Sequence, residues 1–188
     1  CFKYGSTKDY IIDMLVVMAN GELIRTGSNT IKNATGYNLG SLFIGSEGTL
    51  GIVVEATIKL IPKPEETQVI MAYFNTVEES IQAVNKIIEK QVFPATIDFM
   101  DKNSIQTIEN FNPSGLLCDK EAALIIEIDG YKSSITPQRE TICSILRENN
   151  AANIQYSTTK EESDKLWSAR RSSMAACTML RPNITTDD

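Results

Sequence analysis

The 188-residue sequence contains no histidine and a single tryptophan. Imidazole is the usual general base near neutral pH and a common metal ligand, so histidine-based catalysis and Cys/His metal sites are excluded from this chain. The four cysteines are far apart and form no C-x-x-C pair; they are Cys1, Cys118, Cys143 and Cys177. We therefore expect reduced thiols in a cytoplasmic protein and no metal site.

Long apolar runs and excess positive charge are also missing. The longest apolar stretch, near Ile52, contains Glu55 and Lys59 and is too short to cross a membrane. The net charge of −6 argues against nucleic acid or an anionic membrane surface as the main partner. A hydrophobic content of 42% is ordinary for a globular chain that buries a core.

Glycine, in contrast, is concentrated in one stretch. Five of the ten glycines lie between Gly36 and Gly51, and the last three recur at every third position. An apolar run, residues 52–61, follows at once and predicts a buried strand. Neither a dinucleotide nor a nucleotide-triphosphate fingerprint is present. The residues alone leave two interpretations open, a tight strand corner or a loop whose backbone contacts a cofactor.

The first third of the chain is typical of strands. Apolar, β-branched residues 10–18 predict a strand, and Asn20-Gly21 predicts a tight hairpin turn before a return strand at 23–26. A short helical turn is expected near residues 39–43. Pro62 and Pro64, followed by Glu65-Glu66, predict a linker because proline cannot continue a strand ladder.

After this linker, strands alternate with helices. Strands are expected at 68–74, 96–100, 122–128 and 154–157, with a break at 129–130. Thr76 with Glu79, and Thr159 with Glu162, have the spacing of capping boxes that begin helices. Thr136 is expected to cap another helix, with Pro137 at its first position. The order predicts a ferredoxin-like sheet with helices on one side and one further helix running to about residue 177.

Two motifs carry a resemblance to a known family. The strings TGYNL at 35–39 and GSEGTLGI at 45–52 resemble the end of the FAD-binding domain of the FAD-linked oxidases. These include glycolate oxidase catalytic subunits, D-lactate dehydrogenases and other relatives in the vanillyl-alcohol-oxidase superfamily. The resemblance implies an α+β chain, with residues 1–64 ending an FAD-binding PCMH-type domain. Residues 65–188 would form an incomplete, ferredoxin-like cap domain for the substrate.

The resemblance also implies an activity, that of an FAD-dependent 2-hydroxy acid dehydrogenase. Such an enzyme transfers a hydride from the substrate α-carbon to flavin N5, which gives a 2-oxo acid. Electrons then pass to an electron-transfer flavoprotein or another acceptor. Measured against the family, the chain is expected to be an internal fragment, inactive alone. Its catalytic base and any metal site would lie outside it, because the family's histidine-containing segment is not in this sequence.

Site residues follow from the two matching motifs. The resemblance implies that FAD is held by Glu47, Gly48, Thr49, Leu50, Gly51, Ile52 and Val53. The sequence LWSAR at 166–170 resembles the family's L-W-x-x-R, whose arginine meets the substrate carboxylate. Arg170 is therefore the expected substrate-binding residue, because a guanidinium binds a carboxylate through two parallel hydrogen bonds. Arg171 is expected to be solvated.

Other residues near the glycine loop have more ordinary interpretations. For Glu47 we favour a structural role, in which its carboxylate accepts local backbone N–H bonds, because an anion beside a diphosphate is unfavourable. We interpret Lys32-Asn33 as solvated surface and Tyr37 as a packed ring with a bonded hydroxyl.

Two rival functions remain open. Alternating strands and helices also occur in non-enzymatic modules that bind small molecules, although such a module does not need the glycine loop. The alkyl-glycerone-phosphate synthase branch shares the GSEGTLG string but performs a non-redox exchange. The L-W-x-x-R motif favours the hydroxy acid branch.

Overall fold

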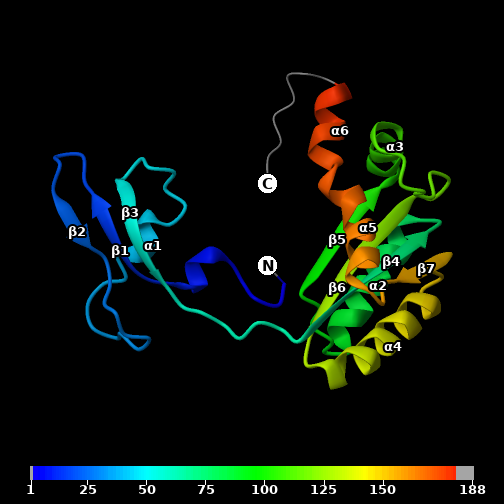
Figure 1. The fold of residues 1–188 in the computed structure, drawn as a ribbon, viewed down its shortest axis with the longest axis horizontal. Coiled ribbons are helices and arrows are strands. Elements are labelled where there is room, and N and C mark those ends of the chain that lie inside the picture. Colours follow the sequence, from blue (N-terminus) through cyan, green and yellow to red (C-terminus); the bar gives the residue numbers. More distant parts are fainter. Residues whose placement is uncertain (1, 181–188) are drawn as a thin grey trace. The chain divides into compact units, whose positions relative to one another are not determined.

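A computed structural model describes residues 2–180 of the chain (Figure 1). These residues form two compact units. The smaller unit is Tyr4–Lys63, and the larger consists of residues 2–3 and 64–180. Each unit has its own sheet.

The smaller unit is a three-stranded antiparallel sheet in the order β2-β1-β3. Its elements are η1 (Thr7–Asp9), β1 (Ile11–Val17), β2 (Leu23–Arg25), α1 (Gly40–Phe43) and β3 (Ile52–Ile58). The β1–β2 hairpin turns at Gly21, whose φ of +84° is readily adopted only by glycine. The hairpin and the short helix lie where the sequence predicts them.

The core of the smaller unit is small. Met14 and Val16 of β1 pack with Phe43 of α1, and these three are its buried apolar cluster. The carboxylate of Asp13 is buried beside them and is held by the Arg25 guanidinium. It also accepts the backbone N–H of Gly27 at 2.9 Å. A buried carboxylate with these partners stabilises the register of β1 against β2 and the segment that follows.

Strand β3 forms where expected, but it is not buried. Ile52 is 64% exposed and Val54 is 55% exposed, although they point to the same face, and Val53 on the other face is also exposed. The strand pairs along one edge with β1, and within the described part of this unit α1 is the one α-helix. The prediction of a buried strand is therefore wrong here, because apolar composition does not supply a covering layer.

The larger unit is built on a four-stranded antiparallel sheet in the order β5-β6-β4-β7. Its strands are β4 (Glu66–Phe74), β5 (Thr96–Asp101), β6 (Ala122–Gly130) and β7 (Asn153–Tyr156). Its helices are α2 (Val77–Glu89), α3 (Lys102–Phe111), α4 (Lys132–Glu148), α5 (Lys160–Arg171) and α6 (Ser173–Leu180). This strand order is that of a ferredoxin-like sheet, with α3 added between β5 and β6. The α+β class predicted from the sequence is confirmed.

Helices cover both faces of this sheet, so the expectation of helices on one side is wrong (Figure 1). Successive side chains of β4 point to opposite faces. Ile70, Ala72 and Phe74 pack with residues of α2 and α4. The alternate residues pack with α3, α5 and α6. Strand β4 is apolar on both faces because it lies between two helical layers.

Several helices begin as their capping residues predict. The capping boxes Thr76/Glu79 and Thr159/Glu162 are both present. Helix α4 differs, because it begins at Lys132 and places Pro137 inside the helix, and β6 continues through the predicted break to Gly130. Proline there removes one helical N–H donor, but the helix still buries Ile135, Ile142 and Leu146. Packing of these side chains in the core therefore outweighs the local preference for a helix that begins at Pro137.

The loop after α3 is organised by one carboxylate. Glu109 accepts the backbone N–H groups of Ser114, Gly115 and Leu116, each at 3.0 Å to its closer oxygen. Burial alone would raise the pKa of Glu109. The hydrogen bonds from these backbone groups outweigh burial, so the pKa lies below its usual value.

This network predicts a pH-dependent stability. A carboxyl whose pKa is depressed by folding contributes stability above its unfolded pKa, and this is lost as pH falls through the folded pKa. We expect Glu109→Gln to lower the free energy of unfolding by about 1 kcal/mol at pH 7 and by less at pH 3. Denaturant unfolding of both proteins at the two pH values measures this. An equal difference at both would contradict it.

Candidate functional site

The glycine loop between α1 and β3 is a series of tight turns. Gly45, Glu47 and Gly48 have φ values of +83°, +50° and +77°. The turns are closed by hydrogen bonds from the N–H of Ser46 to the Phe43 carbonyl, at 3.1 Å, and from the N–H of Thr49 to the Ser46 carbonyl, at 2.9 Å. A side chain added at Gly45 or Gly48 would meet no atom within 4 Å. The loop thus combines a left-handed backbone with an open surface.

The same loop presents free backbone donors. Within residues 2–180, the N–H groups of Gly45, Glu47 and Gly48 make no hydrogen bond. The unpaired N–H groups of Glu47 and Gly48 are adjacent in the chain, and successive backbone N–H groups in a turn can bind anionic or polar atoms. The loop therefore fits a phosphate-bearing or heterocyclic cofactor, through its main chain instead of its side chains.

Gly51 has a different role from the other two glycines. A Cβ there would lie 2.7 Å from Val16 Cγ1 and 3.0 Å from the Val17 carbonyl oxygen. The absence of a side chain lets the start of β3 lie against β1. Of the two interpretations of the glycine loop, the tight strand corner therefore applies to Gly51 and not to Gly45 or Gly48.

The Glu47 carboxylate does not anchor the loop. It is exposed and accepts no hydrogen bond from the described residues. The loop is closed by the backbone bonds above and by the Thr49 hydroxyl, which donates to the Ser46 carbonyl at 2.6 Å. The expected structural role of Glu47 is therefore wrong, because backbone bonds and the Thr49 hydroxyl close the loop without its carboxylate.

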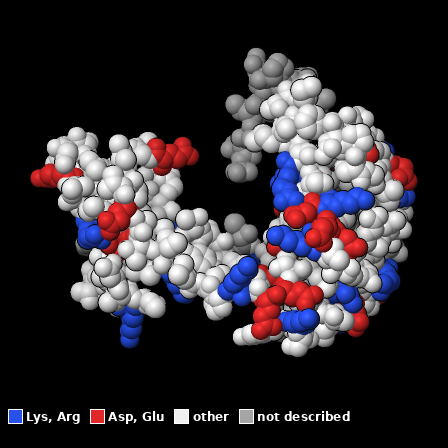
Figure 2. Space-filling view, viewed as in Figure 1, with Lys and Arg blue, Asp and Glu red and all other residues white. Residues whose placement is uncertain are grey.

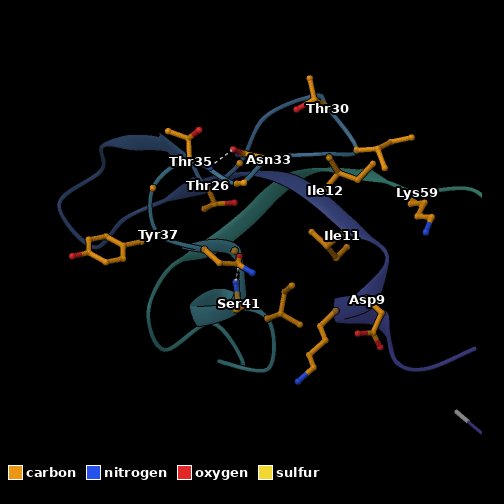
Figure 3. A pocket seen from close by; sticks show the side chains of 18 residues that line it. Asp9, Ile11, Ile12, Thr26, Thr30, Asn33, Thr35, Tyr37, Ser41 and Lys59 are labelled. Carbon is orange, nitrogen blue, oxygen red and sulfur yellow. Dashed lines mark hydrogen bonds between the residues drawn. The ribbon is translucent and has the colours of Figure 1, made fainter.

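A cavity of about 380 Å³ lies elsewhere in the smaller unit (Figure 3). It is bordered by the η1–β1 segment, the loop 26–38 and α1, together with Lys59. Residues 47–53 thus lie outside the lining of this cavity.

Polar groups line much of this cavity. Its charged and polar side chains are Lys8, Asp9, Thr26, Thr30, Asn33, Thr35, Asn38, Ser41 and Lys59. Asn33 and Asn38 fold their own loops, because their side-chain oxygens accept the N–H groups of Thr35 and Ser41, each at 3.2 Å. Both side-chain amide NH₂ groups remain donors. The sequence did not predict Lys8 and Lys59 as cavity residues, since each lies in a segment whose pattern predicts only a strand or its flank.

Tyr37 differs from its prediction. It is 93% exposed, and its ring points away from the other labelled side chains around the cavity (Figure 3). The prediction of a packed ring is wrong. Asn33, in contrast, lines the cavity, whereas Lys32 does not.

Arg170 occupies the larger unit, on the last turn of α5. Its Nε donates to Asp98 Oδ2 of β5 at 3.1 Å, and its Nη1 donates to Ser173 Oγ at 2.8 Å. One turn earlier, Trp167 Nε1 donates to Glu127 Oε2 of β6 at 2.7 Å. These contacts hold α5 against the sheet. Figure 2 shows acidic and basic side chains interleaved on the face of the larger unit that carries this helix.

The neighbouring Arg171 has different surroundings. It donates to the Asp164 carboxylate at 3.2 Å, and both side chains are more than half exposed. This pair lies along the outer side of α5. Leu166, four residues before Arg170, packs against the core.

A second cavity, of about 360 Å³, adjoins α5 on the side of Leu166 and Ala169. Its floor includes Tyr73, and burial raises the pKa of this phenol to about 12. Tyr73 is therefore a neutral hydrogen-bond donor at any physiological pH. Arg170 does not line this cavity.

Two further features of the described residues concern metals and membranes. Among residues 2–180, no three side chains of His, Cys, Asp or Glu are arranged to hold a metal ion. Within the same range, no helix has the length and apolar composition needed to cross a membrane.

The sequence of the larger unit matches a known protein family. Residues 63–188 match the family described as FAD linked oxidases, C-terminal domain. The chain belongs to the FAD linked oxidases. It is 41% identical over 186 residues to glycolate oxidase subunit GlcD of Bacillus subtilis, covering 99% of this chain and 40% of that protein. It is 30% identical over 169 residues to a D-lactate dehydrogenase of Archaeoglobus fulgidus, covering 89% of this chain and 37% of that protein.

Solved structures show the same fold. A structure of alkyldihydroxyacetonephosphate synthase matches this FAD-linked oxidase chain with a TM-score of 0.72 and 23% sequence identity. The match covers 95% of this chain and 35% of that one. At this identity the likeness concerns the fold alone. The chain thus spans about two fifths of the length of the curated relatives above.

The different roles of the loop glycines can be tested by stability. Gly51→Ala should lower the free energy of unfolding of the smaller unit by roughly 1–3 kcal/mol, because its methyl group has no room beside Val16. Gly48→Asn is the matched control, since asparagine tolerates a left-handed backbone and the space there is open. Thermal or denaturant unfolding measures both. Equal losses would show that the close approach at Gly51 is not limiting.

Proposed function

We propose that this chain is part of an FAD-dependent 2-hydroxy acid dehydrogenase of the glycolate or D-lactate type. The observation that carries the proposal is its similarity, over almost its whole length, to proteins named glycolate oxidase subunit and D-lactate dehydrogenase. Because the chain spans two fifths of those proteins, the complete active site would include residues beyond this chain.

Residues 47–53, which form the second half of the glycine loop and the start of β3, are proposed to hold FAD. The free N–H groups of the loop and the open space at Gly45 and Gly48 support this assignment. When bound, FAD would supply an acceptor for the hydride of the substrate α-carbon. The contribution of this chain is to orient the cofactor through main-chain donors. In this proposal residues 1–64 end the flavin domain and residues 65–188 form the substrate-binding cap.

Arg170 is proposed to bind the substrate carboxylate. Among the described residues its guanidinium uses two of its five N–H donors, so an edge remains for a second carboxylate. A charge-assisted pair at that edge would orient the substrate α-carbon. The sequence has no histidine, so a histidine base for the hydroxyl proton would come from outside this chain.

The remaining parts of the proposal rest on the resemblance of the sequence motifs to the family. The electron acceptor would be an electron-transfer flavoprotein or another redox partner, and the protein would act in the cytoplasm. The net charge of −6 accords with a small-molecule substrate and not with nucleic acid.

Two rival functions are less well supported. A synthase-like, non-redox activity shares the fold at 23% identity, whereas the 41% identity is to a glycolate oxidase subunit. A non-enzymatic binding module has no use for a loop with three unpaired N–H groups above open space. If either rival were the function, this chain would take no part in the oxidation of 2-hydroxy acids.

The cofactor site is tested by adding a side chain to the open face of the loop. In the complete enzyme, Gly48→Asn should reduce the ratio of bound FAD to protein at least several-fold. The new side chain would occupy the space that the cofactor needs, while asparagine tolerates the positive φ better than valine would. Flavin absorbance of the purified protein measures the ratio.

A matched control is available in the β1–β2 hairpin. Gly21 has a φ of +84° and nothing within 4 Å of an added Cβ, as at Gly48. Gly21→Asn should keep a normal FAD ratio. Normal FAD content in a well-folded Gly48→Asn protein would remove the loop from the cofactor site.

The substrate anchor is tested at Arg170. Arg170→Lys keeps the charge but loses the planar fork, and Arg170→Ala loses both. We expect the alanine variant to lose about thirty- to a thousand-fold in kcat/KM for the best 2-hydroxy acid, with the lysine variant between it and the parent. FAD content should not change. Steady-state reduction of an artificial electron acceptor measures the effect.

Arg171→Ala is the control for this helix. Arg171 lies one residue away but pairs with Asp164 at the surface, so its loss should be mild. If Arg170→Ala retained its kcat/KM while Arg171→Ala did not, the anchor would belong to the neighbouring residue.

A further inference from the structure

The proposed anchor already holds an internal carboxylate. Arg170 Nε and Asp98 Oδ2 lie 3.1 Å apart, with side chains 43% and 30% exposed. Asp98 stands on β5, 72 residues before Arg170 in the chain. A partly exposed ion pair adds little to stability. Its larger effect is on where the guanidinium points and on the charge around it.

A second carboxylate lies on the same face of the sheet. In the register of β5 with β6, Asp98 pairs with Ile125 and Thr96 pairs with Glu127. Glu127 is therefore a diagonal neighbour of Asp98, at about 7 Å. It is held in place by the indole N–H of Trp167, one turn from Arg170 on α5. One carboxylate thus bonds the guanidinium, and a second stands diagonally across the sheet from the first.

The contacts also decide which edge of Arg170 is free. Asp98 occupies Nε, and Ser173 Oγ accepts one proton of Nη1. The remaining donors belong to the terminal nitrogens, so they lie at the outer end of the side chain. One carboxylate can approach this end. A second carboxylate on the same ligand would meet the field of Asp98 and Glu127.

We propose that Asp98 is a positioning and selectivity residue. It fixes the guanidinium of Arg170 and, with Glu127, disfavours 2-hydroxy acids that carry a second carboxylate. The substrate class is then the 2-hydroxy monocarboxylic acids. This inference rests on the proposed function of Arg170 and assigns the cause of the selectivity to this chain.

The two effects of Asp98 separate in two variants of the complete enzyme. Asp98→Asn keeps an oxygen to accept from Nε but removes the charge. It should raise kcat/KM for malate relative to glycolate roughly three- to ten-fold, through KM. Asp98→Ala also removes the acceptor. Its kcat/KM for glycolate should fall about ten-fold or more because the fork is no longer oriented.

A matched control and a binding measurement accompany these kinetics. Asp164→Asn makes the same change in the neighbouring pair with Arg171 and should leave the malate-to-glycolate ratio unchanged. Acetate and malonate are unreactive ligands with one and two carboxylates. Their dissociation constants, from perturbation of the flavin absorbance, should show the same shift in ratio in Asp98→Asn as the substrates do.

The outcomes distinguish this inference from the proposed function. If Arg170→Ala impairs glycolate oxidation but Asp98→Asn leaves both ratios unchanged, Asp98 does not set the selectivity and the anchor stands. If Asp98→Ala matches Asp98→Asn on glycolate, the positioning role is overturned. If Arg170→Ala changes neither KM nor ligand binding, the anchor and this inference both fall.

Discussion

Burial of strand β4 on both faces is the constraint that arranges the larger unit. Its residues from Val69 to Phe74 are all buried, so each face needs a helical layer. One layer is α2 with α4, and the other is α3, α5 and α6. Helix α5 is mostly polar and buries Ala169 alone completely. It is held to the sheet by Ala169, by the partly buried side chains of Leu166 and Trp167, and by the polar contacts of Trp167 and Arg170.

The contacts of Arg170 explain how one charged side chain can hold a helix in place and still keep unused N–H donors. A fully buried guanidinium would need every donor paired, and a fully exposed one would be mobile. Arg170 is between these limits, with one carboxylate and one hydroxyl as partners. The sheet fixes one end of the guanidinium, and its terminal nitrogens remain for a ligand. Pre-organisation of this kind reduces the entropy lost when a ligand binds.

Features that depend on neighbouring residues in the chain could be predicted from the sequence. The hairpin at Gly21, the capping boxes of α2 and α5 and the left-handed glycines all follow from local rules. Features set by distant contacts could not. The start of α4 before Pro137 depends on packing against the sheet, and the pairing of Asp98 with Arg170 depends on strand register. The apolar sequence of β3 predicts a buried strand, but burial requires a covering layer of other elements, which no local pattern specifies.

The smaller unit shows how few apolar contacts can support the glycine loop. Its buried cluster consists of Met14, Val16 and Phe43, a small core for a unit of this length. The glycine loop adds positive-φ turns and unpaired N–H groups, which contribute no stability by themselves. A ligand that binds the folded loop and not the unfolded chain stabilises it by mass action. Folding of this unit and retention of its proposed cofactor are therefore coupled, and a substitution that weakens either one will weaken the other.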